Sequence, residues 1–261
     1  MDSTASQHDT VRSSFERQTA LFTGPTAVFA GAAGAASETW GALDPEATAL
    51  DVACGAGHVS EQLAPHVRQV VGIDLTPTLL DLGARRLAGA DVRNVLLQVG
   101  DAADLPFTSG SFDLVVCRSS LHHFVDVEAS LCEMRRVCRS GGRVAINELV
   151  QPPGADATTR GRYDAVHRLL DPSHLHALTD EELAELITVA VGTIGHHSRS
   201  ESPPMRVDTI LTDASDRDAV WAAFDAELDG GPPSGLDPSR TDDAMHVVFR
   251  TATYHVDIPD R

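Results

Sequence analysis

The feature that most constrains the fold is a regular alternation of short apolar runs and amphipathic stretches between residues 47 and 150. The apolar runs have the length of strands and few polar residues, which is typical of strands buried on both faces. The stretches between them place apolar residues at helical spacing. Strands that alternate with helices predict a parallel sheet covered by helices on both faces. We expect five strands here, at residues 47–53, 69–74, 94–100, 112–118 and 142–150.

The helices between these strands have recognisable boundary signals. One is expected to begin over residues 58–65, directly after a glycine-rich loop. Pro77 stands at the favoured first position of a helix that continues over residues 78–88. The pair Gly141-Gly142 is expected to end a helix over residues 127–138, because glycine often follows the last helical turn.

The chain after residue 152 is less regular. Thr179 and Glu182 have the spacing of a capping box, which predicts a helix over residues 179–191. Residues 244–256 alternate in polarity and predict a closing strand. Further elements are expected at 158–170 (helix), 192–200 (strand) and 216–228 (helix).

Three segments follow from this pattern. Residues 1–42 are expected to form an N-terminal helical lid, in which residues 1–10 are polar and frayed and the remainder carries enough apolar surface to pack over a site. Residues 43–151 form the core of the domain. Residues 152–261 supply substrate-side helices and the closing strands of the same domain.

Composition excludes several classes of partner. The formal net charge is −18, and all 20 basic residues are arginines. Such an acidic chain is unsuited to a nucleic-acid backbone or an anionic membrane, which favours a small-molecule substrate. There is no basic start followed by an apolar segment and no apolar run of membrane-spanning length. The 4 cysteines form no CxxC pair, which indicates free thiols and a cytoplasmic protein. A homodimer is kept as an assembly to test.

Polar or small residues gather where the predicted strands end. They are the loop 53–57, Asp74, the turn 100–102 and the segment 117–123. Ligands of open parallel sheets bind at the carboxyl ends of the strands. Each feature alone has a plain alternative: Asp74 could cap the helix at Pro77, and Asp101 could be a turn residue. Together, in this order, they indicate an adenosine site.

The ligand at this site need not carry phosphates. A dinucleotide loop has the pattern G-x-G-x-x-G, whereas Gly57 is followed here by His-Val-Ser. A phosphate-binding G-x-x-x-x-G-K-[ST] motif is also absent, and the chain contains no lysine.

The chain resembles the class I S-adenosylmethionine-dependent methyltransferases. More narrowly, it is similar to the small-molecule group that includes the ubiquinone/menaquinone C-methyltransferases and natural-product O-methyltransferases. The resemblance rests on LDVACGAGHVS (50–60), VVGIDLTPTLL (70–80), QVGDAADLPFTSGSFDLVVCRSSLHHF (98–124) and LCEMRRVCRSGGRVAINELV (131–150). It implies a Rossmann-like, doubly wound α/β fold with a seven-stranded sheet. The last strand is antiparallel and follows an insertion over residues 201–243.

The resemblance also implies cofactor-binding residues. Those framing the methionine part of S-adenosylmethionine are Asp51, Ala53, Gly55 and Gly57. Those near the nucleoside are Asp74 at the ribose, Leu75 against the adenine, and Asp101 and Ala102 at the adenine edge. Arg118 begins the segment that borders the methionine tail and the substrate. The family usually has glycine where Ala53 stands, and alanine is compatible with binding if its φ is negative.

Two residues are candidates for catalysis. Methyl transfer to a hydroxyl requires removal of a proton, and His122 lies after the fourth strand with a side chain suited to a general base. Glu148, at the end of the fifth strand, would orient it. The loop LHHF (121–124) differs from that of the quinone C-methylating members, which favours O-methylation. C-methylation of a quinone-like or aromatic acceptor stays an alternative, as does a cyclase or decarboxylase that reuses the fold.

Substrate-wall candidates come from outside the strands: Phe22, Phe29, His123, Tyr163, His167 and Trp221, with His174 and His176 nearby. His123 beside Phe124 could also serve packing alone. The histidines at 167, 174 and 176 invite a metal site, but their spacing lacks an H-x-x-x-H pattern with an acidic partner. We therefore expect no metal.

Overall fold

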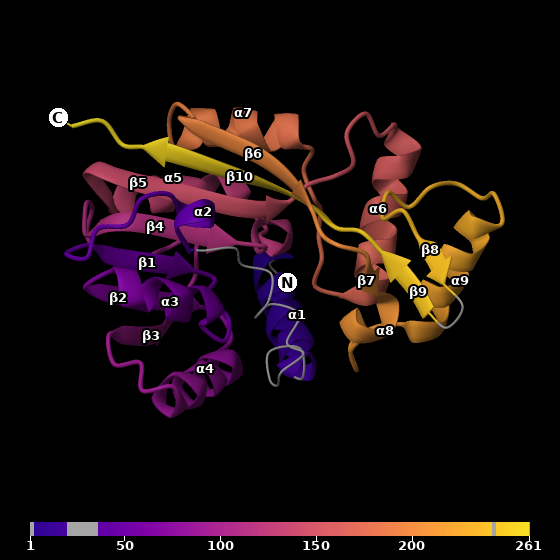
Figure 1. Cartoon of the computed structure of the whole chain (residues 1–261), viewed down its shortest axis with the longest axis horizontal. Coiled ribbons are helices and arrows are strands. Elements are labelled where there is room, and N and C mark those ends of the chain that lie inside the picture. Colours follow the sequence, from indigo (N-terminus) through magenta and orange to yellow (C-terminus); the bar gives the residue numbers. More distant parts are fainter. Residues whose placement is uncertain (1–2, 20–35, 242–243, 261) are drawn as a thin grey trace.

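A computed structural model describes residues 3–19, 36–241 and 244–260. It is built on one seven-stranded sheet with the order β3-β2-β1-β4-β5-β10-β6 (Figure 1). The first five strands are parallel, and β10 runs antiparallel to both β5 and β6. The strands are β1 (Thr48–Val52), β2 (Gln69–Asp74), β3 (Val95–Val99), β4 (Phe112–Arg118), β5 (Cys138–Leu149), β6 (His196–Glu201) and β10 (Arg250–Asp257). The predicted seven-stranded sheet with an antiparallel last strand is confirmed.

Alternate residues of the central strands enter two separate cores. Leu50 and Val115 pack with α5 (Val127–Val137) and α7 (Asp180–Ala190) on one face of the sheet. Ala49 and Val116 pack on the other face with α2 (Ala36–Trp40) and α3 (His58–Leu63). Because both faces are covered, both sets of side chains must be apolar, and this explains the continuous apolar runs in the sequence. A further helix, α4 (Pro77–Gly89), packs against β2 and β3.

A second, smaller unit, here called the cap, stands at one end of the sheet (Figure 1). It has a three-stranded sheet with the order β7-β9-β8 and its own hydrophobic core. Its elements are α6 (Ala157–Leu170), β7 (Met205–Arg206), α8 (Val207–Ile210), α9 (Arg217–Leu228), β8 (Ser239–Thr241) and β9 (Ala244–Val247). The part of the cap at residues 202–249 is joined to the main sheet by two neighbouring links, one after β6 and one before β10, and Ser202 N donates to Phe249 O across them at 2.9 Å.

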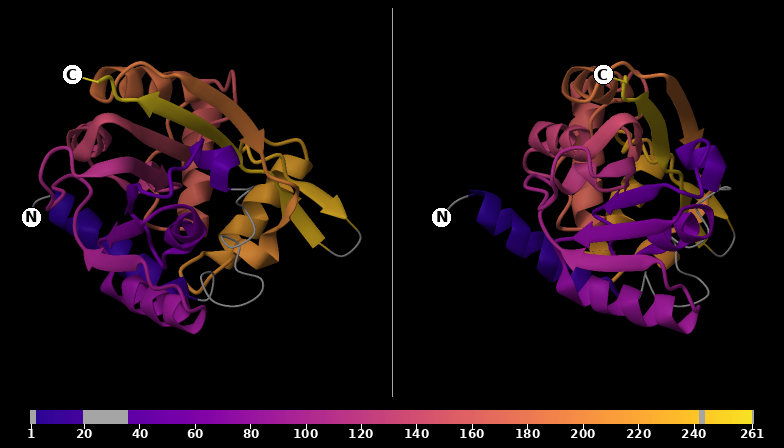
Figure 2. Two further views of the ribbon diagram at one scale, coloured as in Figure 1. Left: turned by 60° about the vertical axis from the view of Figure 1, so that its left-hand side comes forward. Right: turned by 90° about the vertical axis from the view of Figure 1, so that its left-hand side faces the viewer.

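Helix α1 (Ser3–Arg17) extends the N-terminal region along the lower side of the sheet (Figure 2). The prediction that residues 1–10 are frayed is wrong for residues 3–10, which are helical. The helix is held by contacts that sequence patterns do not show. Gln7 Nε2 donates to Ser173 O at 2.9 Å, and Ser14 Oγ donates to an Asp171 carboxylate oxygen at 2.8 Å.

Two other sequence predictions need correction. Residues 244–256 do not form one strand, because the chain leaves the cap sheet at Val247 and enters the main sheet at Arg250. Gly141-Gly142 does not end α5, which stops at Val137 as β5 begins. The glycines instead allow the irregular start of β5, where Gly141 has φ +71° and a Cβ on Gly142 would lie 2.7 Å from Asp113 O.

Several predicted boundaries are confirmed. The capping box of α7 is present, with the Thr179 hydroxyl accepting from Glu182 N at 3.1 Å and the Glu182 carboxylate accepting from Thr179 N at 2.9 Å. Asp216 caps α9. Within the described ranges, no helix has both the length and the apolar character needed to cross a bilayer.

Candidate active site

The loop between β1 and α3 turns sharply at the carboxyl end of the sheet. Ala53, Gly55 and Gly57 all have positive φ, at 55°, 54° and 71°. The condition stated for Ala53, a negative φ, is therefore not met, because the backbone turns immediately after β1. An alanine in the left-handed region is strained by roughly 1–2 kcal/mol, since its Cβ approaches the following carbonyl oxygen. Ala53 and Gly55 line the cavity described below, whereas Gly57 starts α3 and shapes the turn from outside that lining.

Asp51 lies inside the sheet beneath this loop. Its side chain is buried, and Ser60 Oγ donates to Asp51 Oδ2 at 2.6 Å. Burial raises the pKa of Asp51 from 3.8 to about 7, although the Ser60 hydroxyl and the charge of Arg118 oppose the rise. The carboxyl group is thus poised to ionise fully when a positive charge binds nearby.

Asp74 ends β2 and faces the same loop. One carboxylate oxygen accepts from Gly55 N at 2.8 Å, and the other accepts from Thr76 N at 2.8 Å. Burial raises the pKa of Asp74, and these two N–H groups oppose the rise. Asp74 therefore braces the loop and the start of α4, and it also lines the cavity together with Leu75.

The turn after β3 completes this part of the site. Asp101 accepts from Ala103 N at 2.9 Å, and its other oxygen lies 3.6 Å from His8 Nε2 of α1. Asp101 and Ala102 line the cavity. The ends of three strands, β1, β2 and β3, therefore meet α1 around a single opening, as expected for a site at the carboxyl edge of a parallel sheet.

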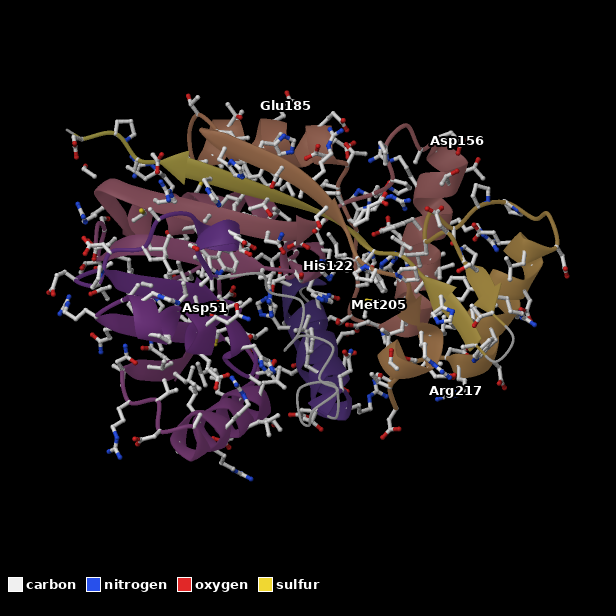
Figure 3. All side chains as sticks on the ribbon, in the orientation of Figure 1. Asp51, His122, Asp156, Glu185, Met205 and Arg217 are labelled. Atoms are coloured by element: carbon white, nitrogen blue, oxygen red, sulfur yellow. The ribbon has the colours of Figure 1, made fainter. Side chains whose placement is uncertain are left out.

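The cavity has a volume of about 740 Å³ and extends from the β1–α3 loop to the cap. At the sheet end it is lined by Asp51, Asp74, Asp101 and Arg118. At the cap end it is lined mainly by apolar and histidine side chains: Leu149, His167, Leu170, His174, Met205 and Phe249. Figure 3 shows the same progression, with Asp51 in the sheet, His122 where the sheet meets the cap, and Met205 at the start of the cap.

His122 lines this cavity and forms a buried pair with Glu148, which lies behind it and outside the lining. His122 Nδ1 lies 2.6 Å from Glu148 Oε1, and the side chains are 7% and 3% exposed. Glu148 also accepts from Ser120 N, Leu121 N and Leu149 N at 2.7–2.8 Å. Because the carboxylate only accepts, it holds the proton of His122 on Nδ1 and leaves Nε2 with a lone pair.

The electrostatic surroundings keep His122 neutral. Burial lowers the pKa of His122 well below its ordinary value of 6.5, and the neighbouring His123 and His174 lower it further. Burial raises the pKa of Glu148, and its three backbone donors oppose that rise. With four hydrogen bonds to its oxygens, Glu148 is suited to remain a carboxylate beside a neutral imidazole.

His123 has a different environment. Its ring lies 4.1 Å from that of His122 and makes an edge contact at 5.1 Å with Phe15 of α1. Ser173 Oγ is 3.1 Å from His123 Nδ1. His123 lines the cavity and at the same time connects α1 to the loop before α7.

The other substrate-wall candidates divide into four groups. His167 and His174 line the cavity. Tyr163 and Trp221 lie instead in the cap core: Tyr163 is 1% exposed with its ring 4.1 Å from that of His167 at a tilt of 34°, and Trp221 packs against the same cluster. Phe22 and Phe29 lie outside the described residues. His176 shares Asp164 with His174 but does not line the cavity, and the described residues contain no group of three side chains placed to hold a metal ion.

Several lining residues were missed from the sequence. Phe15 and Val11 of α1 stand four residues apart, so a helical apolar spacing could have revealed that face. Met205 and Phe249 had no such signal, because Met205 lies in the two-residue strand β7 and Phe249 in the short link between β9 and β10.

Comparisons with known proteins agree on the central part of the chain. Residues 50–146 match the family model described as a methyltransferase domain. The uncharacterized methyltransferase YcgJ of Bacillus subtilis is 34% identical over 126 residues, which are 48% of this chain and 49% of that protein. A demethylmenaquinone methyltransferase of Deinococcus radiodurans is 42% identical over 123 residues, 46% of this chain and 48% of that protein. Residues 50–146 form a methyltransferase domain.

Solved structures show the same fold beyond this methyltransferase domain. A crystal structure of YcgJ has a TM-score of 0.70 at 22% identity and covers 83% of this chain and 94% of that one. A putative methyltransferase from Bacillus halodurans has a TM-score of 0.73 at 24% identity, with 84% and 95% coverage. The chain spans about half the length of the curated relatives it matches, and the cap residues lie outside the matched methyltransferase domain.

Proposed function

We propose that this protein is an S-adenosylmethionine-dependent methyltransferase that O-methylates a small molecule, with His122 as general base and Glu148 as its positioning partner. The observation that carries the proposal is the buried 2.6 Å contact between His122 Nδ1 and Glu148 Oε1 at the wall of the cavity. The methyltransferase domain supplies the donor half of the reaction. The relatives named demethylmenaquinone methyltransferase support methyl transfer to a small molecule.

The sheet end of the cavity fits the proposed cofactor. S-adenosylmethionine carries a sulfonium and an ammonium group, and Asp51, Asp74 and Asp101 surround this end with acidic side chains. The turns at Gly55 and Ala102 place backbone atoms at the wall of the cavity that the cofactor would occupy. Asp74 would bind the ribose, Leu75 and Ala102 would contact the adenine, and Asp51, with Arg118 nearby, would face the methionine part. A volume of about 740 Å³ lies in the range of sites that enclose a cofactor and a small substrate.

The chemistry at His122 follows from its tautomer. Bound S-adenosylmethionine supplies an electrophilic methyl group. An acceptor hydroxyl would donate a hydrogen bond to His122 Nε2. As the new O–CH₃ bond forms and the S–CH₃ bond breaks, the hydroxyl proton passes to Nε2. The Glu148 carboxylate stabilises the resulting imidazolium, while the cap and α1 keep water from the reacting atoms.

The test uses S-adenosylmethionine with a labelled methyl group, and the products are identified by mass spectrometry. Titration calorimetry measures binding of S-adenosylmethionine, and incubation with a metabolite extract measures transfer of a labelled methyl group. O-methylation is established by the position of the label in the purified product. If the cofactor binds but no methyl group is transferred to any small molecule, the proposed activity is refuted.

C-methylation is the second candidate, because several curated relatives are named demethylmenaquinone methyltransferase. A ring-bound label in the product would support it over O-methylation. A non-methylating reaction is the third candidate. The structure titled as the [4+2]-cyclase SpnF matches with a TM-score of 0.56 at 18% identity, which shows a shared fold alone. An acceptor that is changed without gaining a methyl group would support that alternative.

The proposed partners remain those predicted from composition: a small molecule, with no nucleic acid or membrane surface. A homodimer stays a prediction, to be measured by light scattering on the purified chain.

A further inference from the structure

The cap end of the cavity contains a row of three buried imidazoles. The rings of His122 and His174 lie 5.3 Å apart, and those of His174 and His167 lie 4.9 Å apart and are stacked. All three side chains line the cavity and are at most 7% exposed. The proposed base, His122, is therefore the first of three neighbouring imidazoles that line the cavity.

Each imidazole has one nitrogen already engaged by a protein oxygen. His122 Nδ1 faces Glu148 at 2.6 Å, and His167 Nδ1 faces Tyr163 O at 2.9 Å. His174 Nε2 faces Asp164 Oδ1 at 2.7 Å. Carboxylate and carbonyl oxygens can only accept, so each of these ring nitrogens carries the hydrogen. In a neutral imidazole the opposite nitrogen is an acceptor.

Two of these opposite nitrogens have no partner within the described part of the chain. His167 Nε2 and His174 Nδ1 are both buried and make no hydrogen bond there. Burial lowers the pKa of His167 to about 3, so its ring stays neutral and Nε2 stays an acceptor. Buried polar atoms without partners destabilise a fold, and a ligand that donates hydrogen bonds would satisfy them.

The remaining lining restricts the ligand further. Arg118 is the only arginine among the described residues that line the cavity, whereas Asp51, Asp74, Asp101, Asp171 and Glu201 also line it. An anionic acceptor would face this acidic lining with little compensation. Leu170, Met205, Ile210 and Phe249 provide apolar walls at the cap end.

We propose that the acceptor is an uncharged molecule with an apolar body and at least two hydroxyl groups. One hydroxyl would be methylated at His122, and a second would donate its hydrogen bond to His167 Nε2. His167 is then a specificity-determining residue. This proposal rests on the proposed function, because it assigns the acceptor end of the same site.

The test uses matched pairs of probes that differ by one hydroxyl group: catechol with phenol, and 2,3-dihydroxynaphthalene with 2-naphthol. 3-Hydroxy-2-naphthoic acid serves as the anionic probe. Binding is measured first by calorimetry without cofactor, and methyl transfer is measured second with S-adenosylmethionine. We expect at least one diol to bind about tenfold or more tightly than its single-hydroxyl partner, and the acid to bind more weakly than the diol.

Variants then assign the preference to named atoms. His167→Phe keeps a planar ring but removes Nε2, and should reduce the preference for the diol to about twofold or less. His167→Gln offers an amide oxygen as acceptor and should restore part of it. His176→Phe is the matched control, because His176 bonds to the same Asp164 carboxylate but does not line the cavity. The control should keep the full preference.

The outcomes separate this proposal from the proposed function. A diol preference without methyl transfer would refute the methyltransferase activity and support the assignment of this end. Methyl transfer with equal binding of diols and single-hydroxyl probes would overturn the assignment alone. Absence of binding by every diol would also overturn it. Tight Zn²⁺ binding that is lost in His174→Phe would overturn it in favour of a metal site.

Discussion

Replacing Asp51 by asparagine should stabilise the protein and weaken cofactor binding. Asp51 is buried beneath the β1–α3 loop, and burial raises its pKa from 3.8 to about 7. Because the folded-state pKa lies above the unfolded one, ionisation of Asp51 opposes folding. The loss of stability begins as the pH rises above about 4 and is complete above about 7. The side-chain amide introduced by Asp51→Asn would have a similar shape and could still accept from Ser60 Oγ, but it could not ionise.

The magnitude follows from the two pKa values. A rise from 3.8 to about 7 corresponds to roughly 4 kcal/mol of lost stability when the carboxyl is fully ionised, at about 1.4 kcal/mol for each pH unit. At about pH 5.5 the loss of folding stability is roughly 2 kcal/mol, because the Asp51 carboxyl is ionised in the unfolded chain but still mostly protonated in the folded one. The gain from Asp51→Asn should therefore grow by roughly 2 kcal/mol between about pH 5.5 and about pH 8.

Urea unfolding at several pH values measures this difference. The exposed Asp81→Asn on α4 serves as control, since its carboxylate faces solvent in the folded chain. The same samples should show S-adenosylmethionine binding to the wild type that weakens as the pH falls below about 7, because protonation removes the charge that attracts the cation. Asp51→Asn should bind weakly at every pH. A stability gain that does not change with pH, or that shrinks as pH rises, would refute the reasoning.

Three further predictions concern the same site. Ala53→Gly should raise the free energy of unfolding by roughly 0.5–1 kcal/mol, because relief of the strained φ exceeds the added flexibility of the unfolded chain; thermal melting that shows a loss would contradict it. His122→Ala should lower kcat about 10²–10⁴-fold while cofactor affinity by calorimetry stays unchanged, and the wild-type kcat at saturating cofactor should not fall from about pH 8 to about pH 6, because the pKa of His122 is held well below 6.5. Glu148→Gln should lower kcat, and adding it to His122→Ala should cause little further loss in steady-state assays; additive losses would assign Glu148 a separate role.

The sequence was informative where burial dictated the residue pattern. The bounds of β2 (Gln69–Asp74) and β4 (Phe112–Arg118) coincide with the prediction, because every side chain of an inner strand must suit one of two apolar cores. Asp74 and Asp101 were identified from the strand ends at which they stand, whereas Asp51, inside β1, was identified from the resemblance, and all three line the cavity.

The sequence was less informative where tertiary contacts decide the structure. The alternation over residues 244–256 continues through the link between two sheets, so local polarity could not show that the strand divides. The sign of φ at Ala53 depends on how the loop packs against Asp74, and a single sequence contains no direct signal for it. The partners of α1, such as Ser173 and Asp171, lie far along the chain and become neighbours only through the fold.

The two links that follow β6 and precede β10 allow residues 202–249 to vary while the main sheet is kept. Glu201 and Arg250 are direct partners in the β6–β10 register, so residues 202–249 are inserted at the tip of what is otherwise a hairpin. The ends of this insertion lie one strand spacing apart, about 5 Å. A segment anchored in this way can be lengthened, exchanged or grafted without shifting the strands beneath it, provided that its α9 still fits α6. Exchange of this insertion would replace the apolar wall formed by Met205, Ile210 and Phe249, while His122, His167 and His174 stay in place.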